Sequence, residues 1–190
     1  MTNTLRPNFH AWIFVLVLLL PVAANPPAAA DTSDRLFGTV LFMRHALAPG
    51  FGDPDHFSLE DCSTQRNLDE TGRAQARLIG AKLAAANIKF SAIYSSYWCR
   101  CLETAQLIGL GAVTPFDGLN SFFQNHAPRE ATLVKLRQKL DSLSPLAPAS
   151  LMITHSVTIR AITGLYVAPG GVVIYDLKTG RARELSLSSL

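Results

Sequence analysis

Arginine and histidine residues stand directly after apolar stretches at three points of the sequence. Arg44 and His45 follow the apolar stretch 36–43, Arg100 comes shortly after a second one, and His155 ends a third. An imidazole can attack phosphorus in line and hold the phosphoryl group until water removes it. Guanidinium groups match the oxygens of a phosphate in a fork geometry. These residue types favour chemistry on an anion, and that chemistry requires no metal.

The pattern of apolar residues predicts strands that alternate with helices. Short apolar runs rich in β-forming residues predict strands at 36–43, 90–94, 112–116 and 151–154. Helical spacing and capping residues predict helices at 69–87, 95–109, 129–143 and 157–165. A closing hairpin is expected at 172–175 and 182–187. This order predicts an α/β fold, a three-layer sandwich whose mostly parallel central sheet carries helices on both faces.

The predicted sheet brings the candidate residues to one edge. Ligands of such folds bind beyond the carboxyl ends of the strands, where Arg44, His45, Arg100 and His155 all fall. Each residue alone has a simpler explanation, because a charge often marks the point where a strand leaves the core. Their shared edge favours a site instead.

A long loop follows the first predicted strand. Residues 48–67 include two prolines and two glycines, and loops of this length are usually functional or disordered. Arg66 lies at its end and is a candidate for a further substrate contact. His56 in this loop and His126 in a later one are expected to be solvated, and Trp98 is expected to serve packing.

The N-terminus has the three parts of a secretory signal peptide. Arg6 is its only charged residue, an unbroken apolar run spans 11–20, and three alanines precede Asp31. A membrane-spanning helix would need roughly 20 apolar residues, and Pro21 ends the run too early. The sequence therefore predicts a signal peptide at 1–30, one domain at 31–190, a periplasmic or secreted protein, and no stable membrane span after cleavage.

Charge and cysteine content narrow the functional classes. The chain carries 17 basic and 14 acidic residues, and removing Arg6 leaves 16 against 14. This near balance argues against a nucleic-acid binder, which would show a basic stripe. Cys62, Cys99 and Cys101 are the only cysteines. In an oxidising compartment Cys62 is expected to pair with Cys99 or Cys101, and a zinc site is not expected because no pairs of ligands accompany them.

Four stretches in chain order resemble the motifs of the histidine phosphatase, or phosphoglycerate mutase-like, superfamily. LFMRHA at 41–46 is similar to its Arg-His-Gly signature, with Ala46 in place of the glycine. NLDETGRAQA at 67–76 and IYSSYWCRCLETAQLI at 93–108 resemble its two following helical elements. MITHSVTIRAITG at 152–164 resembles the strand that ends in its second histidine.

The resemblance implies that His45 is the phosphorylated nucleophile and that Arg44, Arg100 and His155 complete a phosphate pocket. It implies that Thr104 and Glu103 support the helix that carries Arg100. No cofactor or metal is implied.

The proton donor departs from the family pattern. Many members place an acid after the third strand, where this chain has Asp117 and Glu130, neither of them in a family motif. The long loop offers further candidates, which are Asp53, Asp55, Glu60 and Asp61. Small phosphohistidine phosphatases of the family manage without this acid, because an imidazole leaves easily.

The resemblance and the signal peptide together predict an exported, metal-independent phosphohydrolase that works through a phosphohistidine. Its expected substrate is a small phosphorylated molecule, such as a sugar phosphate, since the layout is similar to the lipopolysaccharide core heptose phosphatase branch. The alternatives are a catalytically weak protein that binds phosphorylated ligands and a mutase-like phosphotransferase.

Overall fold

The computed structural model of the chain describes residues 1–2 and 36–188. Residues 3–30 of the expected signal peptide lie outside the described residues. Within the described part, no helix is long and apolar enough to cross a membrane.

A six-stranded sheet forms the centre of the molecule, with the strand order β3-β2-β4-β1-β5-β6. The first four strands in the chain pair in parallel, and β5 and β6 form an antiparallel hairpin beside β1. The strands are β1 Thr39–Arg44, β2 Ala92–Ser95, β3 Val113–Pro115, β4 Ser150–Thr154, β5 Val172–Asp176 and β6 Ala182–Leu185. The sheet is thus mostly parallel, and the closing hairpin lies at its antiparallel end, as predicted.

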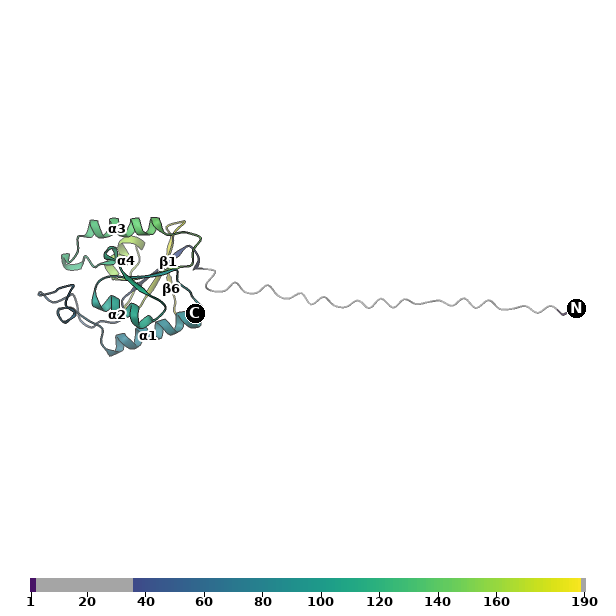
Figure 1. The fold of residues 1–190 in the computed structure, drawn as a ribbon, viewed down its shortest axis with the longest axis horizontal. Helices are drawn as coiled ribbons and strands as arrows, with labels where there is room; N and C mark the ends of the chain where they lie inside the picture. The colour runs from purple at the N-terminus through teal and green to yellow at the C-terminus, as the bar shows by residue number, and fades with distance from the viewer. Residues whose placement is uncertain (3–35, 189–190) are drawn as a thin grey trace.

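Helices cover both faces of the sheet (Figure 1). The helices are α1 Glu70–Ala85, α2 Cys99–Ile108, α3 Arg129–Ser142 and α4 Ser156–Thr163. Figure 1 shows α3 and α4 on one side of the sheet and α1 and α2 on the other. This arrangement confirms the predicted three-layer α/β fold.

The β1 strand shows why its sequence is apolar without alternation. Leu41 and Met43 pack into the core cluster beneath α1 and α2, while Val40 and Phe42 pack into the cluster beneath α3 and α4. All four side chains are fully buried. A strand buried on both faces needs apolar residues at every position, and its neighbours on both sides fix its carboxyl end.

The α1 helix lies close enough to the β1 exit to need a glycine. A Cβ at Gly72 would lie 1.9 Å from the carbonyl oxygen of Leu47, so any other residue would push the helix away. Asp69 caps the helix by accepting the N–H of Gly72. Gln75 accepts the N–H of Leu47 at 2.8 Å and donates to Pro169 O. The hydrogen bonds of Gln75 in α1 therefore fix the position of the turn that follows His45.

One predicted helix start was wrong. Ser95-Ser96 were expected to cap a helix, but α2 begins at Cys99 with Trp98 as its N-cap and no side-chain capping bond. Ser95 still belongs to β2, and the Ser96 hydroxyl lies within hydrogen-bonding distance of Asn120 and His155. The polar contacts of Ser96 thus serve the sheet edge rather than the helix.

Candidate active site

A cavity of about 270 Å³ opens at the carboxyl edge of the parallel strands. Five residues singled out from the sequence line it, namely Arg44, His45, Arg66, Arg100 and His155. They come from the ends of β1 and β4, from the loop before α1, and from the first turn of α2. These five side chains therefore meet at the edge of the sheet where the strand order predicted a site.

His45 is buried with a fixed ring orientation. Its Nδ1 lies 2.7 Å from the carbonyl oxygen of Ala46, which only accepts, so Nδ1 carries the proton. Nε2 is then unprotonated, and the Nε of Arg100 donates to it at 3.3 Å. Burial, followed by the charge of Arg100, lowers the pKa of His45 to about 3. A neutral imidazole with a bare Nε2 is the nucleophilic form.

Arg100 is held by a carboxylate within the pocket. Its Nη1 and Nη2 donate to the two oxygens of Asp53 at 2.7 and 3.1 Å, and the two side chains are 3% and 4% exposed. Asp53 also accepts the indole N–H of Trp98 and the backbone N–H of Arg66. Burial opposes its charge, but Arg100 and these donors outweigh burial and hold the pKa of Asp53 below its ordinary value.

Two further guanidinium groups flank the cavity. Arg44 donates from Nη1 to the Tyr166 hydroxyl and to Val167 O, both at 3.1 Å. Its Nε is buried without a hydrogen-bond partner among the described residues. Arg66 donates from Nε to Gly52 O at 2.8 Å and from Nη1 to the carbonyl oxygen of Ala48. Three guanidiniums against one carboxylate give the pocket an excess of two positive charges, which suits an anionic ligand.

His155 faces His45 across the site, with the ring centroids 5.5 Å apart. Its Nε2 lies 3.0 Å from Ser96 Oγ and 3.4 Å from the Cys101 sulfur. Burial, followed by the charge of Arg100, holds the pKa of His155 well below its ordinary value. Both imidazoles in the empty pocket are therefore neutral near pH 7.

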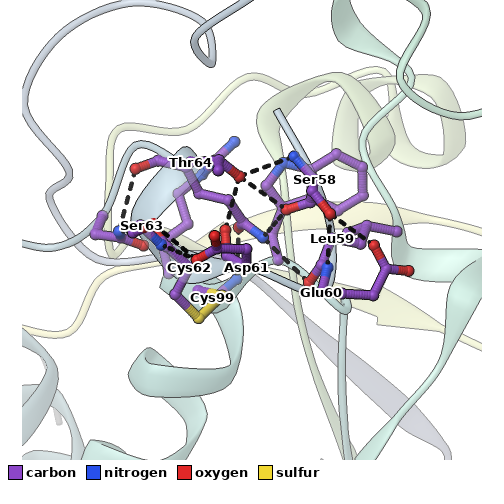
Figure 2. The surroundings of a disulfide bond; sticks show 12 residues. Ser58, Leu59, Glu60, Asp61, Cys62, Ser63, Thr64 and Cys99 are labelled. Atoms are coloured by element: carbon purple, nitrogen blue, oxygen red, sulfur yellow. Dashed lines mark hydrogen bonds between the residues drawn. A yellow bond between two sulfur atoms is a disulfide. The ribbon is translucent and has the colours of Figure 1, made fainter. Parts of the chain in front are cut away.

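A disulfide ties the long loop to the helix that carries Arg100. Cys62 bonds to Cys99 across 37 residues of sequence, which resolves the pairing left open by the sequence, and Cys101 is a free buried thiol. Figure 2 shows the loop segment from Ser58 to Thr64 closed by its own side-chain hydrogen bonds beside this disulfide. Gln65 accepts the backbone N–H of Cys99 at 2.9 Å. The loop that supplies Asp53 and Arg66 is thus fixed next to Arg100.

Aromatic side chains surround the mouth of the cavity. Phe51, Phe123 and Tyr166 line it and are 88%, 38% and 67% exposed. Phe51 and Phe123 form an edge-to-face pair with centroids 5.3 Å apart. We call these three residues the aromatic rim. Phe123 thus forms part of the cavity wall.

The two acids expected after the third strand as candidate proton donors, Asp117 and Glu130, do not line the cavity. Asp117 pairs with Lys135 of α3, and Glu130 pairs with its neighbour Arg129. Their side chains are 44% and 74% exposed. Among the described residues, Asp53 is the carboxylate that lines the cavity. Asp55, Glu60 and Asp61 of the long loop are exposed and do not line it.

Three further residues beside the site make supporting contacts. Thr104 accepts the N–H of Ala46 at 3.0 Å and donates to Arg100 O, so it supports the site as predicted. Glu103 pairs with Arg73 and joins α2 to α1. Trp98 is fully buried against Phe57, as expected.

His126 was expected to be solvated, but it is partly buried in the structure. Its ring packs on Phe57 at 4.3 Å, and its Nε2 is buried.

Sequence reasoning missed three groups around the pocket. It placed Asp53 only among four loop acids and gave no role to Asn120 or Tyr166. Asp53 lies 47 residues from Arg100 in the chain, and no local motif connects them. Within the described residues, no three histidine, cysteine or acidic side chains gather as metal ligands.

The comparisons with known proteins agree with this geometry. Residues 40–122 match the sequence family described as histidine phosphatase superfamily (branch 1), a range that includes Arg44, His45, Arg66 and Arg100 but ends before His155. No curated protein sequence matches the chain at a significant level.

Solved structures share the fold at low identity. The protein histidine phosphatase SixA complexed with tungstate has a TM-score of 0.54 and 14% identity, covering 78% of this chain and 94% of that one. A mycobacterial glucosyl-3-phosphoglycerate phosphatase in complex with VO3 has a TM-score of 0.52 and 14% identity, covering 78% and 97%. Identities this low show the fold alone. Over residues 40–122 the chain is thus similar to the histidine phosphatase superfamily, and its fold is shared with solved structures that include a protein histidine phosphatase.

Proposed function

We propose that the protein is a metal-independent phosphohydrolase in which His45 becomes phosphorylated. The observation that carries this proposal is the bare Nε2 of His45, which lies beside Arg100 in a buried pocket with excess positive charge. A hydrogen bond to Ala46 O fixes the ring, and a neutral imidazole at this place needs no other group to activate it.

The reaction proceeds in two displacements. Nε2 of His45 attacks phosphorus, a P–N bond forms, the bond between phosphorus and the leaving oxygen breaks, and the leaving oxygen takes a proton from solvent. Water then attacks the phosphohistidine and gives a proton to solvent, the P–N bond breaks with its electron pair returning to Nε2, and inorganic phosphate leaves. Arg44, Arg66 and Arg100 are placed to hold the phosphoryl oxygens in both steps, and each well-aimed donor of this kind is worth about 3 kcal/mol at a transition state.

The carboxylate in the pocket is a poor proton donor. Asp53 is ionised and accepts hydrogen bonds from Arg100 on both oxygens, so it orients the guanidinium rather than protonating a leaving group. This observation favours substrates whose leaving group departs easily. Phosphohistidine is the second candidate substrate on this ground, because a neighbouring fold belongs to a protein histidine phosphatase.

The aromatic rim supports a sugar phosphate as the first candidate. Phe51, Phe123 and Tyr166 are exposed aromatic side chains at the cavity mouth, where the group esterified to the phosphoryl would rest. Aromatic faces combine apolar contact with a polar edge, which suits the C–H face of a sugar ring. A substrate like that of lipopolysaccharide core heptose phosphatases fits this rim and the expected export.

We also propose that the protein acts in the periplasm or outside the cell. The support is the signal-peptide pattern of residues 1–30 together with the Cys62–Cys99 disulfide, since disulfides persist in oxidising compartments. Alkaline phosphatase fusion after residue 35 would report export, and a signal from the cytoplasm alone would contradict it.

The test is covalent trapping on the purified protein. Wild type is expected to hydrolyse p-nitrophenyl phosphate and sugar phosphates and to retain ³²P after an acid-free quench. His45→Ala is expected to lose both, while His56→Ala, at an exposed loop position, is expected to keep both. Equal turnover by His45→Ala would end the proposal.

The remaining outcomes separate the alternatives. Binding of phosphate without any ³²P adduct would identify a binding protein. Transfer of ³²P to an added acceptor alcohol in preference to water would identify a mutase.

A further inference from the structure

Asn120 lies behind the second histidine and has a fixed amide orientation. Its Oδ1 accepts the backbone N–H of Tyr97 at 3.0 Å and lies 3.1 Å from Ser96 Oγ. A backbone N–H requires an acceptor, so the atom at this position is the amide oxygen and not the nitrogen. The oxygen can only accept from Ser96 as well.

The Ser96 hydroxyl has one hydrogen for two neighbours. If that hydrogen went to His155, the lone pairs of Ser96 Oγ and Asn120 Oδ1 would face each other at 3.1 Å. If it goes to Asn120, the Ser96 oxygen is free to accept from His155 Nε2 at 3.0 Å. The second arrangement satisfies every buried group, which native structures strongly prefer. His155 therefore carries its proton on Nε2.

The other ring nitrogen of His155, Nδ1, is available to a ligand in the cavity. Nδ1 makes no hydrogen bond with any described residue, while the ring lines the cavity and is 4% exposed. Nε2 is directed at Ser96 and Cys101, which do not line the cavity. In a neutral imidazole with Nε2–H, the remaining nitrogen is an acceptor.

We propose that the Asn120–Ser96 pair fixes His155 as a hydrogen-bond acceptor, so that the pocket selects tetrahedral oxyanions that still carry a proton. The ligand class is a hydrogen phosphate or the monoanion of a phosphomonoester, whose P–OH donates to Nδ1. A fully deprotonated oxyanion such as sulfate would place an oxygen lone pair against this nitrogen. The inference rests on the proposed function only in taking the cavity as a phosphate site.

Protonation of His155 is the alternative way to satisfy a deprotonated oxyanion, and the surroundings oppose it. Burial and the charge of Arg100 lower the pKa of His155, with smaller effects of His45, Arg66 and Arg44. The Cys101 thiol beside Nε2 has a pKa raised to about 12, so it adds no negative charge. Asp53 is occupied by Arg100. We therefore place the shared proton on the ligand.

The substrate's own ionisation then limits catalysis. Phosphomonoesters lose their second proton at a pH of about 6. Above that pH, kcat/KM is expected to fall by about tenfold per pH unit, because only the monoanion carries the required hydrogen.

The binding test compares two anions of the same shape and charge. At about pH 8 inorganic phosphate is mainly HPO₄²⁻ and differs from SO₄²⁻ by its hydrogen. Calorimetry at constant ionic strength is expected to show phosphate bound about 10-fold or more tightly than sulfate, the ratio that an unmade buried hydrogen bond gives. Equal affinities would overturn the inference.

Two variants at Asn120 separate the tautomer from general damage to the site. Asn120→Leu removes the acceptor, lets Ser96 donate to Nε2, and moves the proton to Nδ1. The preference for phosphate is then expected to shrink to within about threefold. Asn120→Gln keeps an amide oxygen without adding a charge and is expected to keep the preference, as is Ser91→Ala, whose contacts lie at the start of β2.

A direct measurement does not depend on the variants folding. Long-range ¹H–¹⁵N spectra of labelled wild-type protein are expected to show His155 protonated at Nε2 and bare at Nδ1. A proton on Nδ1 would overturn the inference.

Failure of the inference and failure of the proposed function give different results. A ³²P adduct without anion preference refutes the inference alone, and preference for phosphate without any adduct refutes the hydrolase alone.

Discussion

Two segments border the cavity, and they differ in the charged groups that they contribute. The segment 46–69 after β1 supplies Asp53 and Arg66 beside the ring of Phe51, and it is joined to α2 by the Cys62–Cys99 disulfide. The segment 116–128 after β3 supplies the exposed ring of Phe123, while its acid Asp117 turns to Lys135 in solvent. We call them the charged wall and the apolar wall.

The difference shows that separate segments of the fold contact the phosphoryl group and the rest of the substrate. The charged wall is cross-linked and hydrogen-bonded where charges must be held in place, since preorganised charges act most strongly where water is excluded. The apolar wall keeps its ring exposed where a variable group of the substrate would rest. Charge placement is thus the rigid feature of the site, and the surface for the leaving group is the adaptable one.

The largest expected effect comes from Asp53→Asn. Removing one partner of a buried ion pair leaves Arg100 unpaired, and the unfolding free energy should fall by about 3 kcal/mol. Added phosphate should restore more stability to the variant than to wild type, because the anion replaces the lost charge. Urea denaturation with and without phosphate measures both. Asp55→Asn, at an exposed position of the same loop, is the control, and equal loss there would break the comparison.

The disulfide should contribute a similar amount. Its cysteines are 37 residues apart, and a cross-link of this kind typically stabilises a protein by about 2–4 kcal/mol. Cys62→Ser combined with Cys99→Ser should lose that stability and also weaken phosphate binding, because Asp53 and Arg66 lose their tether. Denaturation and calorimetry measure the two effects. Lost stability with unchanged phosphate affinity would show that the tether does not position the charged wall.

The buried histidines between the walls should make stability fall with acid. The pKa of His45 is lowered to about 3 and that of His155 is also lowered, against about 6.5 in the unfolded chain. Between these values only the unfolded state takes up the proton, so stability is complete above pH of about 6.5 and declines below it. His45 should remove about 2 kcal/mol between pH 8 and 5, and His155 should add to the decline in the same direction. His45→Asn should reduce the decline by about 2 kcal/mol, and an unchanged decline would contradict it.

The apolar wall predicts a smaller and different loss. Phe123→Ala removes a rim side chain, so KM for aryl and sugar phosphates should rise by about three- to tenfold. The affinity for inorganic phosphate should stay the same, because the ring contacts only the leaving group. Steady-state kinetics beside calorimetry separate the two. A parallel loss of phosphate affinity would show that the two walls do not have separate roles in binding.

The smallest effect is expected at the solvent acids. Asp117→Asn and Glu130→Gln should change kcat and KM by less than about twofold, since both carboxylates form exposed ion pairs outside the cavity. A large drop in kcat for esters with poor leaving groups, with no change for p-nitrophenyl phosphate, would restore one of them as the acid.

Local sequence patterns predicted the helices and strands, and the strand topology predicted where the site residues meet. The unbroken apolar run of β1 and the cap at Asp69 are local signals, and parallel strands bring Arg44, His45 and His155 to one edge whatever the loops do. The start of α2 could not be predicted, because Ser96 bonds to Asn120 rather than to the helix.

The role of Asp53 could not be predicted either. Four loop acids have similar local surroundings in the sequence, and only the disulfide and the packing of the loop decide which one reaches Arg100. Contacts of this kind depend on the tertiary fold and leave no spacing pattern.

The free thiol of Cys101 has a consequence for how long the disulfide lasts. It lies two residues from Cys99, where an exposed thiol would readily attack the disulfide and shuffle it. Cys101 is instead fully buried, and its pKa is raised to about 12, so at pH 7 only about one molecule in 10⁵ carries a thiolate there. The native fold thus protects its own cross-link from exchange, and an odd number of cysteines leaves a single stable covalent form.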